Sequence, residues 1–184
     1  MLSNIPIVID CSKMKKENTG LYSFCLHLTN EIQNIARSEG KSITIFAFQK
    51  TFSIFPSDIH KIKIQPWNTC FFSLPSRYKI WHSTFQLGKY LPDGKQNKIL
   101  TVHDLKFLYE RNKKGYASEI KLLQKQIDKA DQIVAISEYT KQDLLKHMDL
   151  HEKKIEVIYN GCERYNGPVN LPKAYVPKKS TYLH

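Results

Sequence analysis

Short apolar runs alternate with polar segments along most of the chain, and each run ends in polar residues. Most of the runs are rich in β-branched and aromatic residues and have little polar interruption, which predicts buried strands. The predicted strands cover residues 5–9, 43–48, 78–81, 99–102, 132–136 and 155–159, with a weaker candidate at 59–64. Turn signals separate them, such as Pro92-Asp93-Gly94 before the strand predicted at 99–102.

Between some of these runs, apolar residues recur at helical spacing. The first predicted helix starts at Thr19-Gly20 and stops at Gly40. Its apolar stripe comprises Leu21, Phe24, Cys25, Leu28, Ile32, Ile35 and Ala36. A second helix is predicted over 116–129, with an inward stripe of Ile120, Leu123, Ile127 and Ala130. A third should begin after Ser137, a suitable N-cap, with Glu138 in the first turn where it meets the positive end of the helix dipole.

The alternation of strands and helices indicates the α/β class: a doubly wound, mostly parallel, Rossmann-like sheet with helices on both faces. A chain of 184 residues is long enough for one full hydrophobic core. We expect residues 1–167 to form this domain and residues 168–184 to be a linker.

The ends of the predicted strands carry the polar residues that are candidates for chemistry. They are Asp10, His82, Ser83, His103, Asp104, Ser137, Glu138 and Asn160. In an open parallel sheet, ligands bind outside the carboxyl ends of the strands, so we expect a crevice at this edge. Ordinary loop polarity is the alternative explanation. His103 could hydrogen-bond a hydroxyl group or shuttle a proton, with Asp104 orienting it; alternatively, neighbouring backbone satisfies its ring.

Thr19-Gly20 stands where a helix start would offer free backbone N–H groups to a phosphate. With a single glycine, neither G-x-G-x-x-G nor a Walker loop is present, which argues against the usual modes of NAD or ATP binding. A glycine needed only for the turn is the other interpretation.

The loop between Pro66 and Pro75 is aromatic, with Trp67, Phe71, Phe72 and Leu74. It fits either a small satellite hydrophobic cluster or a lip that touches an apolar acceptor or a membrane surface.

The net charge and the cysteine content limit which binding partners and which metal or disulfide sites are expected. Twenty-eight Lys and Arg against 17 Asp and Glu give a net charge of +11, which favours polyanions such as nucleotide phosphates, nucleic acid or an acidic membrane. The lysines are scattered, as on an ordinary solvated surface, so nucleic acid is not indicated. The four cysteines follow no disulfide or zinc spacing, no metal motif is present, and no signal peptide or membrane span is recognisable. We therefore expect a metal-free cytoplasmic protein with reduced thiols.

Several short motifs, in this order, resemble the amino-terminal half of the family 4 glycosyltransferases. They are Thr19-Gly20-Leu21-Tyr22, Trp81-His82-Ser83, Leu100-Thr101-Val102-His103-Asp104-Leu105, the stretch from Ala130 to Leu144 (ADQIVAISEYTKQDL), and Lys154 to Gly161 (KIEVIYNG). The resemblance implies one half of a two-domain GT-B fold that transfers a sugar, mannose or glucose in similar enzymes, from a GDP- or UDP-sugar with retention and usually without a metal.

The resemblance also implies roles for individual residues. Thr19 and Gly20 would bind the donor phosphates, and His103 would contact the transferred sugar or the acceptor. Asp10, His82, Ser83, Asp104, Ser137 and Glu138 would line the acceptor cleft. The acceptor would be a glycan or a lipid-linked sugar, and weak contact with the inner face of the membrane is compatible with this picture.

The carboxy-terminal domain of the family, which carries an acidic E-x-x-x-x-x-x-x-E donor motif, is missing from this chain. The chain ends at His184, after a linker containing Pro168, Pro172 and Pro177, at what we expect to be the start of this missing domain. We therefore expect an acceptor-side domain that is inactive without a donor-binding domain, supplied in cis or in trans. The alternative is a basic binding or regulatory module that pairs with a separate catalytic chain or with a polyanion.

Overall fold

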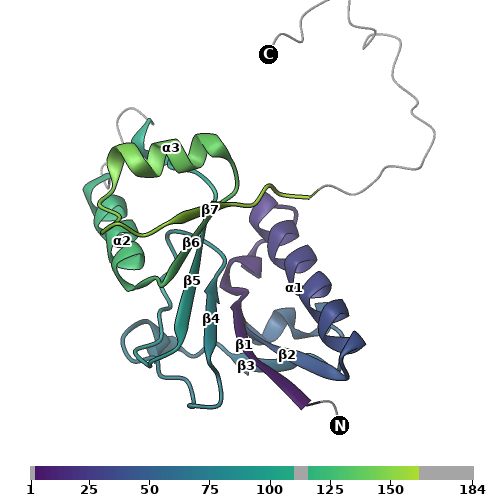
Figure 1. Cartoon of the computed structure of the whole chain (residues 1–184). Helices are drawn as coiled ribbons and strands as arrows, with labels where there is room; N and C mark the ends of the chain where they lie inside the picture. Colours follow the sequence, from purple (N-terminus) through teal and green to yellow (C-terminus); the bar gives the residue numbers. More distant parts are fainter. Residues whose placement is uncertain (1–2, 110–115, 162–184) are drawn as a thin grey trace, which may run out of the picture.

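The computed structural model describes residues 3–109 and 116–161. They form a seven-stranded sheet in the order β3-β2-β1-β4-β5-β6-β7, in which every neighbouring pair is parallel (Figure 1). The strands are β1 (Ser3–Asp10), β2 (Lys41–Ala47), β3 (His60–Lys63), β4 (Ile80–Ser83), β5 (Asn97–Val102), β6 (Gln132–Ala135) and β7 (Ile155–Val157). The helices are α1 (Gly20–Ser38), α2 (Tyr116–Lys129) and α3 (Glu138–His147), with 3-10 turns η1 (Ser12–Lys15), η2 (Gln49–Ile54), η3 (Pro66–Thr69) and η4 (Lys106–Leu108).

The direction of winding reverses between β1 and β4. From β1 the chain moves outward through β2 to β3, then returns past β1 and continues through β4 to β7. The carboxyl ends of β1 and β4 therefore carry connections that leave in opposite directions. In a doubly wound sheet this reversal is the switch point where a ligand crevice forms.

The alternation of side chains along β1 separates two cores. Ile7 and Ile9 pack under α1 with Cys25 and Ala36. Val8 points to the opposite face, where it joins a cluster with Trp81.

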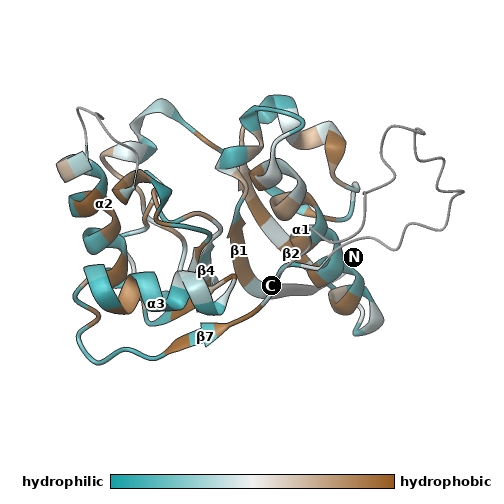
Figure 2. Ribbon diagram, turned by 90° about the horizontal axis from the view of Figure 1, so that it is seen from above, coloured by the Kyte–Doolittle hydropathy of each residue, from teal (hydrophilic) through white to brown (hydrophobic). Residues whose placement is uncertain are grey.

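A third hydrophobic cluster packs under α2 and α3, and the strand register places it on the same face of the sheet as Val8. Val8 pairs with Trp81, and two residues further along β4 Ser83 pairs with Leu100, which packs with Leu123 of α2 and Leu144 of α3. The helices thus cover opposite faces, α1 over β1 and β2 and the other two over the β5–β7 end (Figure 1). Seen from above, β1 and β2 are largely apolar, whereas apolar and polar residues alternate along α2 and α3 (Figure 2).

The predicted fold class is confirmed, and all seven strands and three helices occur where the pattern placed them. Gly40 has φ +65° just after α1, a left-handed conformation that favours glycine and ends the helix. The stripe of α1 was wrong at Ile35, which is 64% exposed. Thr29 and Gln33 are buried instead, because Thr29 contacts Cys11 and Gln33 donates to Asp58 and accepts from the Ile43 amide.

The strand boundaries differ from the prediction by one or two residues, and two of these differences have a visible cause. β4 begins at Ile80 because the Tyr78 amide closes a turn onto the Pro75 carbonyl, while the Tyr78 ring is buried in the cluster with Val8 and Trp81. β7 ends at Val157, and the next two apolar residues, Ile158 and Tyr159, are exposed.

Some expectations fall outside the described residues, namely the boundary at 167/168, the segment 168–184 and Cys162. Cys11, Cys25 and Cys70 are free thiols. No helix in the described ranges is both long enough and apolar enough to cross a bilayer.

Candidate functional site

Thr84 connects the three central strands at the switch point. It directly follows β4, is 1% exposed, and donates its hydroxyl to the carbonyl of Asp10 at the end of β1. Its own carbonyl accepts a hydrogen bond of 2.9 Å from Nε2 of His103, which directly follows β5. Cys25 of α1 contacts the same hydroxyl at 3.2 Å. One buried threonine therefore fixes Asp10 and His103 on either side of β4.

The ring of His103 has a defined tautomer. A backbone carbonyl can only accept, so Nε2 carries the proton that is donated to Thr84, and in the neutral ring Nδ1 is a hydrogen-bond acceptor. Burial lowers the pKa of His103, although the bond to Thr84 and the nearby Asp104 charge act in the other direction. Phe24 contacts the ring edge-on at 4.6 Å between centroids. His103 is therefore a neutral imidazole with a hydrogen-bond acceptor atom that none of the described residues uses.

Asp10 is a buried carboxylate at the end of β1. It is 3% exposed, and Oδ1 accepts from the amide of Ser12 at 2.8 Å. Burial raises the pKa of Asp10 to about 6, against the opposing effects of the Ser12 hydrogen bonds and the Lys13 charge. Gly88 lies beside it: a Cβ there would stand 3.8 Å from Oδ2 and only 3.1 Å from the Phe85 carbonyl. An ionisable group kept out of water at a strand end is typical of functional sites.

Lys13 and Phe85, which the sequence analysis did not single out, complete this part of the site. Lys13 Nζ lies 4.2 Å from the centre of the Phe85 ring. Burial lowers the pKa of Lys13 while Asp10 raises it. The centre of the Phe85 ring also lies 6.4 Å from that of the His103 ring, so Phe85 is a neighbour of both Lys13 and His103. The sequence placed β4 at 78–81, two residues too early, so the predicted strand end stopped at Ser83, just before Thr84 and Phe85.

His82 and Ser83 lie beneath the site and are not on its surface. His82 is 9% exposed and its Nε2 is 2.8 Å from Oγ1 of Thr101 on β5. Burial lowers the pKa of His82 to about 4, so the ring is neutral at pH 7. Ser83 accepts a hydrogen bond from the indole of Trp81. The expectation that both line the cleft therefore gives way to a supporting role in the sheet.

Asp104 does not orient His103 through a hydrogen bond. Its Oδ1 accepts from the Lys106 amide at 3.1 Å, a local turn that leads into η4. Its backbone carbonyl accepts from the side chain of Gln86, whose other end accepts from the His103 amide. Gln86 and Thr84 therefore hold the His103 segment, and the exposed Asp104 influences His103 only through its charge.

The start of α3 is attached to the same segment. Ser137 is the N-cap, as predicted, and its Oγ accepts from the Thr140 amide at 3.1 Å. Thr140 in turn donates its hydroxyl to the His103 carbonyl at 3.0 Å. Glu138 is exposed in the first turn of α3. The structure thus brings His103, Ser137 and Glu138 to one edge, with Thr140 as the connection.

The start of α1 lies on the other side of His103. Thr19 is the N-cap and accepts from the Tyr22 amide at 3.2 Å, while Phe24, in the next turn of the helix, touches the His103 ring. A Cβ at Gly20 would meet nothing within 4 Å, and its φ is not in the left-handed region. Neither packing nor backbone conformation requires a glycine there, so the turn interpretation of Gly20 is wrong.

The described residues contain no group of three or more His, Cys, Asp or Glu that could hold a metal ion. One pair of glutamates, Glu31 and Glu39, has the spacing of the family's donor motif. Both are exposed, one on α1 and one at its end, and Glu39 forms an ion pair of 2.6 Å with Lys41. This pair does not reach the site at the switch point.

Comparison with known proteins identifies part of the chain. Residues 74–164 match the family model of Glycosyltransferase Family 4. The matched segment contains β4 to β7, with His103, Ser137 and Glu138, and begins after Asp10 and Gly20. No curated protein matches the chain. The match and the all-parallel, Rossmann-like sheet together show that residues 74–164 belong to the amino-terminal domain of the family 4 glycosyltransferases, consistent with one half of a GT-B fold.

Proposed function

We propose that this chain is the acceptor-side domain of a retaining hexosyltransferase that moves a sugar from a GDP- or UDP-sugar to a glycan or lipid-linked acceptor. The observation that carries the proposal is the state of His103, a neutral imidazole with a bare Nδ1 at the switch point, inside the segment that matches the family. A bare imidazole nitrogen accepts a hydrogen bond from a sugar hydroxyl, whereas a protonated ring could not.

In this proposal, His103 binds and aligns a hydroxyl of the transferred sugar or of the acceptor. The acceptor oxygen bonds to the anomeric carbon as the bond from that carbon to the donor phosphate breaks, and the leaving phosphate takes the acceptor proton. No side chain of this domain then needs to act as a general base, and no metal is required. Lys13, beside the Phe85 ring, provides a positive group where polar substituents of the acceptor would bind, and the buried Asp10 carboxylate balances its charge.

The start of α1 is the proposed site for the donor phosphates. Helix N-termini carry unpaired N–H groups and a partial positive charge, and the open space in front of Gly20 leaves room for a phosphate group to approach. A donor-binding domain, in cis or in trans, would hold the nucleotide from the opposite side.

Two measurements test the proposal. Incubation of the chain alone with GDP-mannose or UDP-glucose and an oligosaccharide acceptor is expected to give no transfer product. Amide chemical-shift mapping with the same acceptor should show changes around Thr84, Phe85 and His103. Product formation by the chain alone would overturn its dependence on a second domain, and acceptor-induced shifts elsewhere with none at these residues would overturn the acceptor site.

Gly20→Ala should weaken binding of the nucleotide sugar without changing the stability of the fold. The added methyl group meets no protein atom, and alanine is favoured over glycine in helices, so the free energy of unfolding should change by less than about 1 kcal/mol. Where the chain works with a donor-binding domain, the KM for the nucleotide sugar should rise about fivefold or more, since the methyl group occupies the approach of the phosphate. Ser23→Ala, an exposed change on the same turn, is the matched control. An unchanged KM in the Gly20 variant would place the phosphates elsewhere.

A further inference from the structure

The segment between β3 and β4 divides its aromatic residues between core and solvent. Phe72 stacks on Phe46 at 4.6 Å and lies edge-on to Trp81 at 5.1 Å, and Leu74 is buried in the same cluster. In contrast, Trp67 is 60% exposed and Phe71 is 79% exposed. The satellite-cluster interpretation of this loop is therefore right for one half of it, and the other half presents two large aromatic side chains to solvent.

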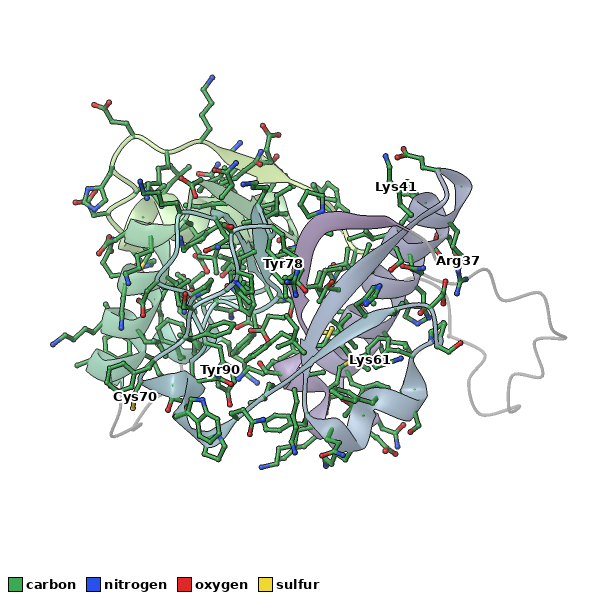
Figure 3. All side chains as sticks on the ribbon, turned by 90° about the horizontal axis from the view of Figure 1, so that it is seen from below. Arg37, Lys41, Lys61, Cys70, Tyr78 and Tyr90 are labelled. Atoms are coloured by element: carbon green, nitrogen blue, oxygen red, sulfur yellow. The ribbon has the colours of Figure 1, made fainter. Side chains whose placement is uncertain are left out.

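These two side chains are held in place and lie on the same side of the loop. The Phe71 amide donates to the Trp67 carbonyl at 2.9 Å, a bond that spans one helical turn. Residues four apart on such a turn are surface neighbours. Gln65 and Asn68 close the start of the turn with reciprocal hydrogen bonds, and Phe72 anchors its end in the core. Cys70, within this turn, lies near the outer edge of the molecule in Figure 3, whereas Tyr78 lies toward the centre.

The Lys and Arg side chains around the two aromatic residues are not balanced by acidic residues in the same segment. Residues 59–92 contain no Asp or Glu. The cations of this stretch are Lys61, Lys63, Arg77, Lys79 and Lys89. The flanking acids already have cationic partners: Asp58 binds Arg37 at 2.6 Å, and Asp93 lies 3.8 Å from Lys129.

A cavity of about 320 Å³ is lined by Asn68 and Phe72, the residues that directly follow Trp67 and Phe71 in the chain. Phe72 and Leu74 contribute to its apolar lining, and Lys63 and Arg77 contribute positive charge. Arg77 lies over the Tyr78 ring at 4.8 Å, which keeps the guanidinium beside this opening. Apolar surface bordered by cations matches the interface of a bilayer with anionic headgroups, where acyl chains lie beneath negative phosphates.

We propose that Trp67 and Phe71, with the cations around them, bind the chain to the surface of an anionic lipid bilayer. The two rings enter the headgroup region, and Lys63 and Arg77 meet lipid phosphates. Two rings and a few cations suit reversible peripheral attachment that weakens as salt screens the charges. This inference concerns a surface apart from the switch point and does not rest on the proposed function.

The two tryptophans of the chain make the test direct. Trp81 is fully buried, so a change in indole fluorescence on adding vesicles reports Trp67. With vesicles of equal parts phosphatidylglycerol and phosphatidylcholine, we expect the emission to shift to shorter wavelength and the chain to sediment with the vesicles. With phosphatidylcholine alone, or at high salt, the bound fraction should be at least fivefold lower.

The double variant Trp67→Ala/Phe71→Ala should lose at least fivefold in vesicle binding while keeping its melting temperature, because both side chains are exposed. Ile35→Ala removes an equally exposed apolar side chain from α1 and should bind like the unchanged protein. Equal binding by the double variant would overturn the proposal. So would an absence of vesicle binding combined with a dimer that the double variant abolishes, since the aromatic pair would then join two copies of the chain.

Discussion

Replacing His103 by alanine is expected to lower turnover at least tenfold when the chain works with a donor-binding domain. The substitution removes the Nδ1 acceptor and also the ring that Thr84 holds through Nε2. Loss of one aligned hydrogen bond to a reacting sugar typically costs one to three orders of magnitude in rate. The measurement is kcat with saturating nucleotide sugar and acceptor.

Two further variants separate this role from a structural one. His103→Gln provides an amide that can donate to the Thr84 carbonyl and still offer an oxygen acceptor, so it should recover part of the lost rate. His60→Ala removes an exposed histidine at the start of β3 and should leave turnover unchanged. An alanine variant with unaltered kcat would remove His103 from the mechanism.

The second large effect is expected for Asp10→Asn, which should increase the free energy of unfolding. Burial raises the pKa of Asp10 from its ordinary value of 3.8 to about 6. A carboxyl group whose pKa is raised by folding stabilises the fold below about pH 4, and this contribution is lost as the pH rises to about 6 and beyond. Asp10→Asn removes the buried charge and keeps an oxygen for the Ser12 amide. At pH 8 the variant should be more stable by roughly 3 kcal/mol, which is the energy of about two pKa units.

Urea denaturation at pH 8 and pH 4 measures this effect. The gain should be large at pH 8 and small at pH 4, where Asp10 is largely protonated in the folded protein. Asp93→Asn, at an exposed carboxylate, should change stability little at either pH. The Asp10 variant should also turn over more slowly with a donor-binding domain, since the carboxylate balances the charge of Lys13 in the site. A variant that is less stable than the unchanged protein at pH 8 would show that the buried charge stabilises the fold.

Much of the fold could be predicted from the sequence, because most of its information is local. The β-branched runs predict buried strands, and the Ser137 N-cap and the left-handed Gly40 fix helix ends through backbone chemistry within a few residues. The errors arose where long-range contacts override local pattern. Ile35 fits the apolar stripe of α1, but Gln33, which donates to Asp58 and accepts from the Ile43 amide, is the buried residue, and Ile35 is exposed.

The sequence also placed Asp10 and His103 at strand ends, but it did not relate them to each other. The reversal of strand order puts β4 between β1 and β5, and this allows Thr84 to bond both residues. His82 and Ser83 occupy equally polar positions at the end of β4, and their burial follows from their bonds to Thr101 and Trp81.

By itself, then, the sequence determined the α/β class, the approximate limits of strands and helices and the edge of the sheet where the polar strand ends meet, because these follow from hydrophobic period and from propensities that act over short distances. Only the tertiary structure decided which polar residues are exposed to a ligand, which nitrogen of His103 is bare, that the Asp10 carboxylate is buried, and that Phe72 packs inward while Trp67 and Phe71 face solvent. Burial and hydrogen-bond partners depend on segments far apart in the chain, and they become defined only when the strands are ordered side by side.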